Sequence, residues 1–385
     1  MKSEINSEYP SVEALREKAK ERVPNFAFEY LDGGCNEDVN IVRNTAEIRD
    51  VQLQPRYLQN YGVSSTKTKV LGMEFDAPFG ISPVGLQGLM WPNSPEILAR
   101  AAHKHNVPFI LSTVTTMNIE RASELTEGKA WFQLYNPVED HVRNDIIDRA
   151  HAAGCPVLVL LCDVPTFGYR PRDIRNGLAL PPKMSARNIM QILGKPSWAF
   201  NTLKHGQPTF ETLKPYTPEG LNLKQLGQFM DKTFSGKLNA EKIKPIRDRW
   251  KGKLVLKGVA SQQDTEDAIK MGFDGIIVSN HGGRQLDAGQ STIASLQDIV
   301  PDYGDKIEVM IDSGLRSGPD IARAMASGAK FTFMGRSFMY GAAALGNNGG
   351  NHTIAMLKRQ FQQVMDQLCC EKVEDLPQHL ITNQT

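Results

Sequence analysis

The sequence predicts a closed barrel of eight parallel strands with helices between them, and two observations support this fold class. Short apolar runs rich in β-branched residues recur from residue 79 onward, and helical stretches separate them. Such alternation indicates a parallel sheet, and eight repeats indicate a (β/α)8 or TIM barrel. In addition, no G-x-G-x-x-G motif follows the first run. This disfavours the main alternative, a doubly wound dinucleotide-binding sheet.

The predicted strands are apolar runs of four or five residues, a length typical of buried strands. They lie at 79–82, 108–111, 130–134, 157–161, 253–257, 275–278, 308–311 and 331–334. Helices are predicted between them at 94–106, 140–153, 265–271 and 319–327. After the last strand we predict a helix at 337–345, a loop at 346–350 and a closing amphipathic helix at 353–368.

Two segments do not follow this repeat, although we treat 1–385 as a single domain. Residues 1–75 are a predicted N-terminal helical extension, in which Ser11 caps a helix that ends near Arg22. Residues 183–250 are a long insertion between the fourth and fifth strands that ends in a helix at 240–250. Loops of this length are commonly lids, interfaces or disordered segments. We rank an active-site lid or a subunit contact above membrane contact for this insertion.

Composition and charge argue against several classes of protein. The formal net charge is +1, without a lysine- or arginine-rich block, so nucleic acid is not an expected partner. No apolar run reaches the roughly 18 residues of a transmembrane helix, and the start, MKSEINSEYP, lacks the apolar core of a signal peptide. The five cysteines are odd in number and lack CxxC spacing. They indicate reduced thiols, no metal site and a cytoplasmic location.

One nonapeptide, Ser279 to Asp287, reads SNHGGRQLD and directly follows a predicted strand. His281 can take up a proton near neutral pH, and Arg284 carries a planar fork that fits a carboxylate. Two adjacent glycines, Gly282 and Gly283, let the backbone turn sharply or approach a ligand closely. A base beside an anion clamp predicts a site for a small carboxylic acid. The alternative is a capped turn with a structural histidine.

Polar groups also follow the other predicted strands, at the end of the barrel where active sites lie. The loops after strands seven and eight contain Gly314-Leu315-Arg316 and Gly335-Arg336. Glycine-bearing loops with arginine suit a phosphate group, and many barrels bind phosphate at these two loops. The sequence therefore predicts a ligand held across the strand ends, with a phosphate near the last two.

The nonapeptide resembles the active-site motif of the FMN-dependent 2-hydroxy acid oxidising family, S-N-H-G-[AG]-R-Q-L-[DY]. This family includes glycolate oxidase, L-lactate dehydrogenase and oxidase, and mandelate dehydrogenase. The resemblance runs from about Tyr30 to the C-terminal helix. It implies a TIM barrel with FMN that oxidises an L-2-hydroxy acid to the 2-oxo acid and passes electrons to oxygen or a diffusible acceptor. It also implies a homotetramer.

The resemblance further implies roles for individual residues. His281 would accept a proton, Asp163 would hold its imidazole, and Lys257 would stabilise negative charge on the reduced flavin. Substrate binding is implied for Tyr30, Tyr135, Arg170, Arg284 and Val114. Cofactor contacts are implied for Val84, Gly85, Ser112, Gln133, Lys257, Ser279, Asp312, Gly314, Arg316, Gly335 and Arg336.

Two departures from the best-known members bear on the chemistry. Leu161 stands where many members have a threonine near the flavin's reactive nitrogen, which leaves flavin potential and oxygen reactivity open. Val114 replaces a bulky tryptophan of glycolate oxidase, so we expect lactate or a longer, branched or aromatic 2-hydroxy acid to be preferred over glycolate.

Three other interpretations stay open. The first is the same fold and flavin with a different α-substituted substrate, such as a modified peptide. The second is an unrelated phosphate-binding barrel. The third is a catalytically inactive flavin-binding barrel.

Overall fold

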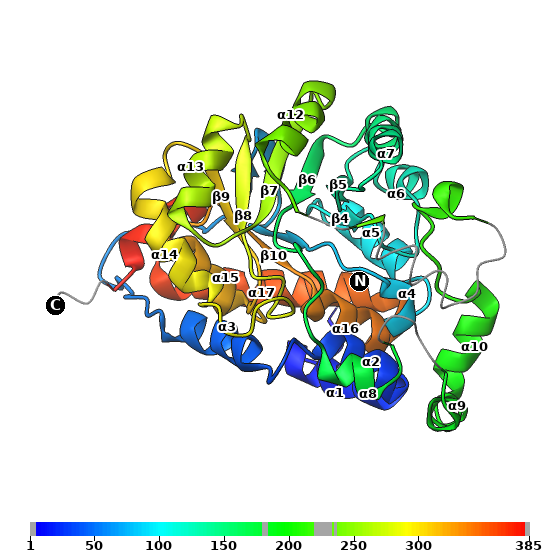
Figure 1. Ribbon diagram of the computed structural model, residues 1–385. Coiled ribbons are helices and arrows are strands. Elements are labelled where there is room, and N and C mark those ends of the chain that lie inside the picture. The colour runs from blue at the N-terminus through cyan, green and yellow to red at the C-terminus, as the bar shows by residue number, and fades with distance from the viewer. Residues whose placement is uncertain (1–4, 179–183, 219–232, 235–236, 382–385) are drawn as a thin grey trace.

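Eight parallel strands form the centre of the molecule (Figure 1). The computed structural model describes residues 5–178, 184–218, 233–234 and 237–381. The strands lie in the order β3-β10-β9-β8-β7-β6-β5-β4, and a bridge between Ile81 and Phe109 joins the two ends of the sheet. Their bounds are β3 Phe79–Ile81, β4 Ile110–Ser112, β5 Trp131–Leu134, β6 Val157–Leu161, β7 Lys253–Val259, β8 Gly275–Val278, β9 Glu308–Ile311 and β10 Phe331–Met334. The predicted TIM barrel is confirmed.

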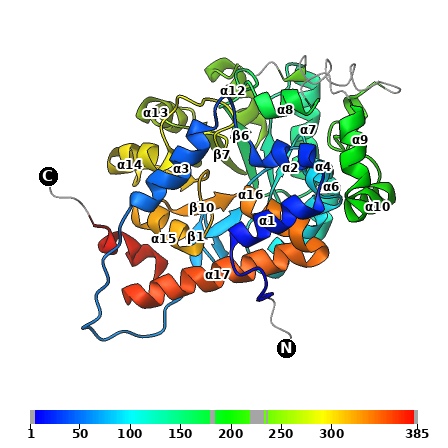
Figure 2. The ribbon, with the colours of Figure 1, turned by 90° about the horizontal axis from the view of Figure 1, so that it is seen from below.

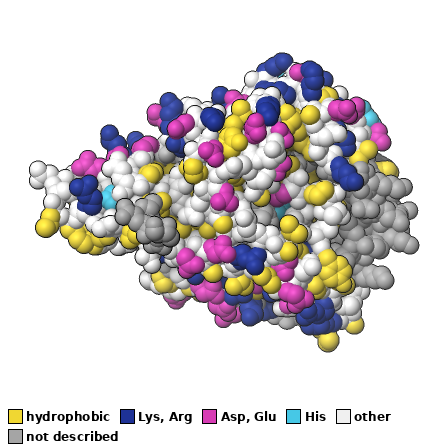
Figure 3. Space-filling view, turned by 60° about the vertical axis from the view of Figure 1, so that its left-hand side comes forward, with side chains coloured by type: hydrophobic (Ala, Val, Ile, Leu, Met, Phe, Trp, Pro, Cys, Tyr) yellow, Lys and Arg dark blue, Asp and Glu magenta, His cyan; other side chains and the backbone are white. Residues whose placement is uncertain are grey.

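Helices cover the outside of the barrel. They are α4 Gln87–Met90, α5 Ser94–Lys104, α6 Ile119–Thr126, α7 Asp140–Ala152, α13 Gln262–Lys270, α14 Thr292–Tyr303, α15 Gly318–Ala326 and α16 Arg336–Leu345. Side chains of Asn118, Ser261, Ser291 and Ser317 cap α6, α13, α14 and α15 by accepting a backbone N–H three residues on. On the face shown in Figure 3, basic and acidic side chains are interspersed, as the near-zero net charge suggests.

An antiparallel hairpin that the sequence did not predict closes the N-terminal end of the barrel. It consists of β1 (Thr68–Val70) and β2 (Met73–Phe75). The ring of Phe75 contacts those of Trp131 and Phe331, with centroids 6.5 and 5.7 Å apart. Both partners are the first residues of their strands. The open end of the barrel is therefore the opposite one, at the C-terminal ends of the strands.

Several predicted boundaries were wrong, and the helix predicted at 265–271 begins three residues earlier, as α13 at Gln262. The second strand begins at Ile110, two residues later than predicted. Residues 346–350 are not a loop: they contain the 3-10 helix η2 (Gly346–Asn348), and α17 (Gly349–Leu368) begins at Gly349. At Gly349 a Cβ atom would lie only 2.0 Å from the carbonyl oxygen of Gly341 on α16. The absence of a side chain allows this close approach of α17 to α16, which propensity alone does not reveal.

The N-terminal extension lies along the rim of the barrel. It contains α1 (Val12–Arg22), α2 (Asn25–Asp32) and α3 (Val39–Asp50). Figures 1 and 2 show these helices beside the C-terminal half of the chain, where α1 packs on α16 and α3 packs on α14 and α15. After α17, the 3-10 helix η3 (Val373–His379) packs on α15.

Part of the predicted insertion, 183–250, lies outside the described residues. The chain between β6 and β7 begins with α8 (Pro171–Arg175), which precedes the insertion. The described part of the insertion contains α9 (Ala186–Leu193), α10 (Pro196–His205), η1 (Lys214–Tyr216) and α12 (Ala240–Arg249). Trp198 anchors α10: its indole N–H donates to the Leu89 carbonyl at 3.1 Å, and its ring contacts Phe26 edge to face. Among the described helices, none is both long and apolar enough to cross a membrane.

Candidate active site

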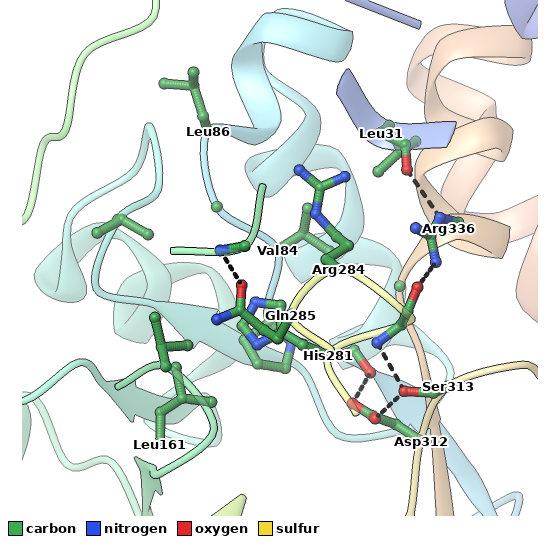
Figure 4. A pocket seen from close by; sticks show the side chains of 18 of the residues that line it. Leu31, Val84, Leu86, Leu161, His281, Arg284, Gln285, Asp312, Ser313 and Arg336 are labelled. Atoms are coloured by element: carbon green, nitrogen blue, oxygen red, sulfur yellow. Dashed lines mark hydrogen bonds between the residues drawn. The ribbon is translucent and has the colours of Figure 1, made fainter. Parts of the chain in front are cut away.

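A cavity of about 630 Å³ opens where the C-terminal ends of all eight strands meet. Figure 4 shows part of its lining, including His281, Arg284 and Arg336. The predicted site residues that line it are Tyr30, Val84, Gly85, Val114, Gln133, Tyr135, Arg170, Lys257, His281, Arg284, Asp312, Gly314, Arg316, Gly335 and Arg336. Residues far apart in the sequence therefore share one cavity.

Three predicted residues lie behind the cavity wall. Asp163 contacts His281, with Oδ1 3.2 Å from Nδ1. The hydroxyl of Ser279 accepts a hydrogen bond from Lys257 Nζ at 2.7 Å. The hydroxyl of Ser112 accepts one from the Val114 N–H at 3.4 Å. Ser112 and Ser279 thus contact neighbouring protein groups rather than the cavity.

His281 is placed to act as a base. Its Nδ1 faces the Asp163 carboxylate, which holds the ring proton on Nδ1 and leaves Nε2 as the acceptor. Nε2 lies 3.4 Å from the Tyr135 hydroxyl. Burial lowers the pKa of His281 below 6.5, although Asp163 opposes this shift. The imidazole is therefore neutral at pH 7. Burial raises the pKa of Tyr135, so its hydroxyl stays protonated.

The loop that carries His281 has an unusual backbone. His281, Gly282 and Gly283 all have positive φ angles of 58°, 68° and 73°. A Cβ atom on Gly282 would lie 2.7 Å from a guanidinium nitrogen of Arg336. The Ser313 hydroxyl accepts the Gly282 N–H at 2.9 Å. Left-handed backbone at a non-glycine residue is strained, and surrounding contacts of this kind hold it in place.

Lys257 lies at the floor of the cavity and is almost fully buried. Its Nζ forms an ion pair with Asp312 Oδ2 at 2.9 Å. Burial lowers the pKa of Lys257, but the charges of Asp312 and Asp163 outweigh this effect and raise it overall. Burial raises the pKa of Asp312, but the charge of Lys257 and hydrogen bonds from Lys257, Ser279 and Ser313 outweigh this effect and lower it overall. Both groups are therefore charged at neutral pH.

Arg284 and Arg170 each keep a nitrogen without a hydrogen bond to any described residue. Nη1 of Arg284 donates to the carbonyls of Tyr30 and Gly33, at 2.6 and 2.8 Å. Nη2 of Arg170 donates to Gln285 Oε1 at 3.1 Å. Nη2 of Arg284 and Nη1 of Arg170 make no such bond. Burial, together with the charge of Arg170, lowers the pKa of Arg284 to about 9. The arrangement suits an incoming carboxylate.

The other end of the cavity is cationic. Arg336 is the first residue of α16 and follows Gly335, so a helix N-terminus meets the cavity here. Its guanidinium donates to the carbonyls of Leu31, Gly282 and Gly33 at 2.8, 2.8 and 2.9 Å (Figure 4 shows Leu31). Burial and the nearby charge of Arg316 lower the pKa of Arg336 to about 10. Two neighbouring cations beside glycines form a site for a phosphate.

The family model for FMN-dependent dehydrogenase matches residues 19–383. The chain belongs to this family. An L-lactate dehydrogenase of Caulobacter sp. (strain K31) is 36% identical over 352 residues, which cover 91% of this chain and 92% of that protein. The (S)-mandelate dehydrogenase of Pseudomonas putida is 33% identical over 374 residues, covering 97% and 94%. A solved structure described as monotopic membrane protein (S)-mandelate dehydrogenase has a TM-score of 0.91 at 33% identity, covering 96% and 98%.

The protein is therefore an FMN-dependent oxidoreductase of 2-hydroxy acids, and its cofactor is FMN. The cavity fits this group. The Nε2 of Gln133 is buried and has no hydrogen-bond partner among the described residues, so it offers a free donor to a polar ring edge. Lys257 places a cation on the same floor, and Arg316 and Arg336 supply the phosphate end. Among the described residues, no group of three His, Cys, Asp or Glu side chains could hold a metal ion.

Gln285, Asp173, Phe210 and Phe234 are among the cavity residues of this oxidoreductase that the sequence analysis missed. Gln285 is the neighbour of Arg284 in the nonapeptide, and its amide donates to the Thr166 carbonyl at 2.9 Å. Asp173 lies one turn after Arg170 at the start of α8. Both could have been found from these positions. Phe210 and Phe234 come from the insertion, where no sequence pattern points to them.

Proposed function

We propose that the protein oxidises an L-2-hydroxy acid whose side chain is apolar and larger than that of glycolate. We also propose that its electrons go to a diffusible acceptor other than oxygen, which the names of two relatives, both dehydrogenases, support. The observation that carries this proposal is the apolar part of the cavity, lined by Val114, Leu161, Leu178, Phe210 and Phe234. A hydroxy acid without a side chain would leave these groups without a partner. Filling such a pocket favours binding by roughly 0.8 kcal/mol per CH₂ group.

The polar side of the cavity supplies the reaction. The substrate loses two electrons and two protons as its α-carbon C–H bond breaks and its C–O bond becomes C=O. FMN, when bound, is the two-electron acceptor. Nε2 of His281 takes one proton, the other hydrogen leaves with the electrons, and Asp163 stabilises the resulting imidazolium. Lys257 offsets the negative charge that develops nearby.

The groups opposite His281 orient the substrate. The free nitrogens of Arg284 and Arg170 bind the carboxylate, and the hydroxyls of Tyr30 and Tyr135 donate hydrogen bonds to it or to the substrate oxygen. The guanidinium of Arg284 also lies over the Tyr30 ring, 5.1 Å from its centroid. This contact keeps both groups on the same side of the cavity.

The test is anaerobic mixing with glycolate, lactate, a branched and an aromatic 2-hydroxy acid while flavin absorbance is followed. We expect bleaching by lactate and the larger acids to exceed bleaching by glycolate, with slow recovery when air is admitted. Fastest bleaching by glycolate would contradict the substrate class. Rapid recovery in air would indicate an oxidase. A flavoprotein that no acid bleaches would be an inactive barrel or would act on another α-substituted substrate.

We further propose that the enzyme is cytoplasmic and assembles as a homotetramer.

We also propose that α9 and α10 contact the membrane surface. These two helices contribute no residue to the cavity. For the insertion as a whole, the sequence ranked an active-site lid or a subunit contact above membrane contact. Met190, Leu193, Phe200 and Leu203 are 66, 76, 67 and 84% exposed. Residues 184–210 contain three Lys or Arg residues and no acidic one. Basic amphipathic helices of this kind lie in membrane interfaces, and a solved relative is described as monotopic.

Vesicle sedimentation tests this contact. Leu193→Asp with Leu203→Asp should abolish co-sedimentation with anionic vesicles and leave soluble turnover unchanged. Leu58→Asp with Val63→Asp is the control, since these side chains are even more exposed but lie in the N-terminal extension. If both pairs behave alike, or if the wild type stays in the supernatant, α9 and α10 are not a membrane contact. Light scattering measures the oligomeric state.

A further inference from the structure

The carboxylate of Asp173 lies between the two arginines of the proposed substrate clamp. Its Oδ2 is 3.8 Å from Nη2 of Arg284 and 3.9 Å from Nη1 of Arg170. Both distances are within reach of an ion pair but too long for a hydrogen bond. These are the same two nitrogens that make no hydrogen bond to the described residues. Asp173 therefore attracts both cations without occupying their donors.

The surroundings make this carboxylate electrostatically important. Asp173 is only 8% exposed and lines the cavity. Among the described residues, it is the carboxylate that pairs with both arginines. Burial raises the pKa of Asp173, and the charges of Arg284 and Arg170 oppose this shift. Two buried like charges repel each other strongly where water is scarce, so a shared counter-charge is needed to keep them adjacent.

Local structure holds Asp173 in this position. The guanidinium of Arg170 reaches Gln285 Oε1 at 3.1 Å on one side, and that of Arg284 reaches the Gly33 carbonyl at 2.8 Å on the other. Pro171 starts α8, which places Asp173 on the same helical face as Arg170, three residues earlier. The backbone carbonyl of Asp173 accepts the Leu178 N–H at 2.8 Å, which ties the chain that follows α8 back to the middle of the helix.

We propose that Asp173 is a positioning residue that draws Arg170 and Arg284 together into one carboxylate-binding fork. The proposal rests on the substrate-binding roles proposed above for the two arginines. Before substrate arrives, Asp173 keeps the two cations adjacent. When the substrate carboxylate binds, it takes the two free donors, and the four charges sum to zero. Without Asp173 the guanidinium groups separate, and a single carboxylate no longer spans both.

The test compares Asp173→Asn, Arg284→Lys and the double variant as FMN-loaded enzymes. Dissociation constants for the 2-oxo acid product come from flavin absorbance titration, and reduction rates come from anaerobic mixing. We expect Asp173→Asn to weaken 2-oxo acid binding by roughly tenfold, because it removes the counter-charge shared by two buried cations, with little change in the Arg284→Lys background. Equal losses in both backgrounds, or unchanged binding in the single variant, would overturn the proposal.

A matched control and a second variant complete the experiment. Asp274 also bridges two cations, Arg247 and Lys253, but at the opposite end of the barrel; Asp274→Asn should leave binding unchanged. If Asp173→Asn takes up no FMN, Asp173→Glu replaces it and should weaken binding by a smaller factor; no change would refute the role. If no 2-hydroxy acid reduces the flavin of the wild-type enzyme, the proposed function is wrong. This outcome differs from a change in 2-oxo acid binding, which tests Asp173 alone.

Discussion

The N-terminal extension and the insertion both reach the rim of the same cavity, but they contact it in different ways. The extension makes hydrogen bonds. Carbonyls of Tyr30 and Gly33 accept from Arg284, and the side chain of Asn280 in the catalytic loop bonds to Asn44 at 2.7 and 2.9 Å. The insertion contributes apolar rings instead, such as Phe234, whose centroid is 5.8 Å from that of Tyr135.

This difference separates two tasks. Hydrogen bonds depend steeply on distance and angle, so the extension can hold His281 and Arg284 in one geometry. Apolar contacts are non-directional and tolerate changes of shape. We therefore expect the extension to support the chemistry of the site and the insertion to shape the space for the substrate side chain. Changes on the first side should alter rates with every substrate, and changes on the second side should alter only the preference among substrates.

The largest effect is expected at His281. His281→Gln removes the proton acceptor but leaves the loop and its ties to α2 and α3. Flavin reduction should slow by at least ~100-fold, the low end for loss of a general base, with every 2-hydroxy acid and with FMN content unchanged. Rapid mixing under nitrogen measures this. Reduction at a near wild-type rate would remove His281 from the mechanism.

Arg284→Lys tests the link between the loop and α2. Lysine keeps the charge but cannot both donate to the Tyr30 and Gly33 carbonyls and grip a carboxylate. Loss of a hydrogen bond to a charged group costs about 1.5–3 kcal/mol, or roughly 10- to 100-fold in kcat/KM. Both substrate binding and reduction should weaken. Should only the flavin spectrum change, with substrate kinetics intact, the carboxylate role would be wrong.

The pH profile should reflect the buried base. Because burial lowers the pKa of His281 below 6.5, the neutral, active form predominates at pH 7 and is lost only as the pH falls through that lower pKa. We expect kcat/KM to decrease by about tenfold per pH unit below the pKa, with the acidic limb centred below pH 6.5. An acidic limb centred above pH 6.5 would contradict this assignment.

Val114→Trp should change substrate preference without changing the chemistry. The larger ring fills the space beside the substrate side chain, where one methylene discriminates by about 1–3 kcal/mol. The ratio of kcat/KM for the aromatic acid over glycolate should therefore decrease by about tenfold or more. FMN content serves as the control. An unchanged order of substrates would show that Val114 does not contact the side chain.

The smallest effect is expected from the insertion. Phe234→Ala removes one ring from the cavity wall, and an aromatic pair contributes about 0.5–1.5 kcal/mol beyond its buried area. KM for the aromatic acid should rise a few-fold, while lactate kinetics stay unchanged. Leu203→Ala, in the same insertion but outside the cavity, is the control. An equal loss with all substrates would mean that the insertion also supports the chemistry. The extension and the insertion would then not have separate roles.

Much of the fold could be predicted from the sequence because burial leaves a local pattern. A strand buried on both faces is a continuous apolar run in the sequence, so the eight strands from Phe79 to Met334 could be predicted without a structure. The hairpin at 68–75 was not, because its strands are three residues long and its partners are Trp131 and Phe331, far along the chain. Short elements of this kind depend on contacts that no local pattern contains.

The same distinction applies to the site. Because SNHGGRQLD is contiguous, a histidine and an arginine could be placed after the sixth barrel strand from the sequence. No sequence pattern places Asp173 between two arginines, the Arg336 guanidinium on the Leu31 carbonyl of α2 about 300 residues away, or Phe234 against Tyr135. The physical reason is that hydrogen bonds, ion pairs and ring contacts act over a few ångströms. Their partners are decided by which segments the folded chain brings together.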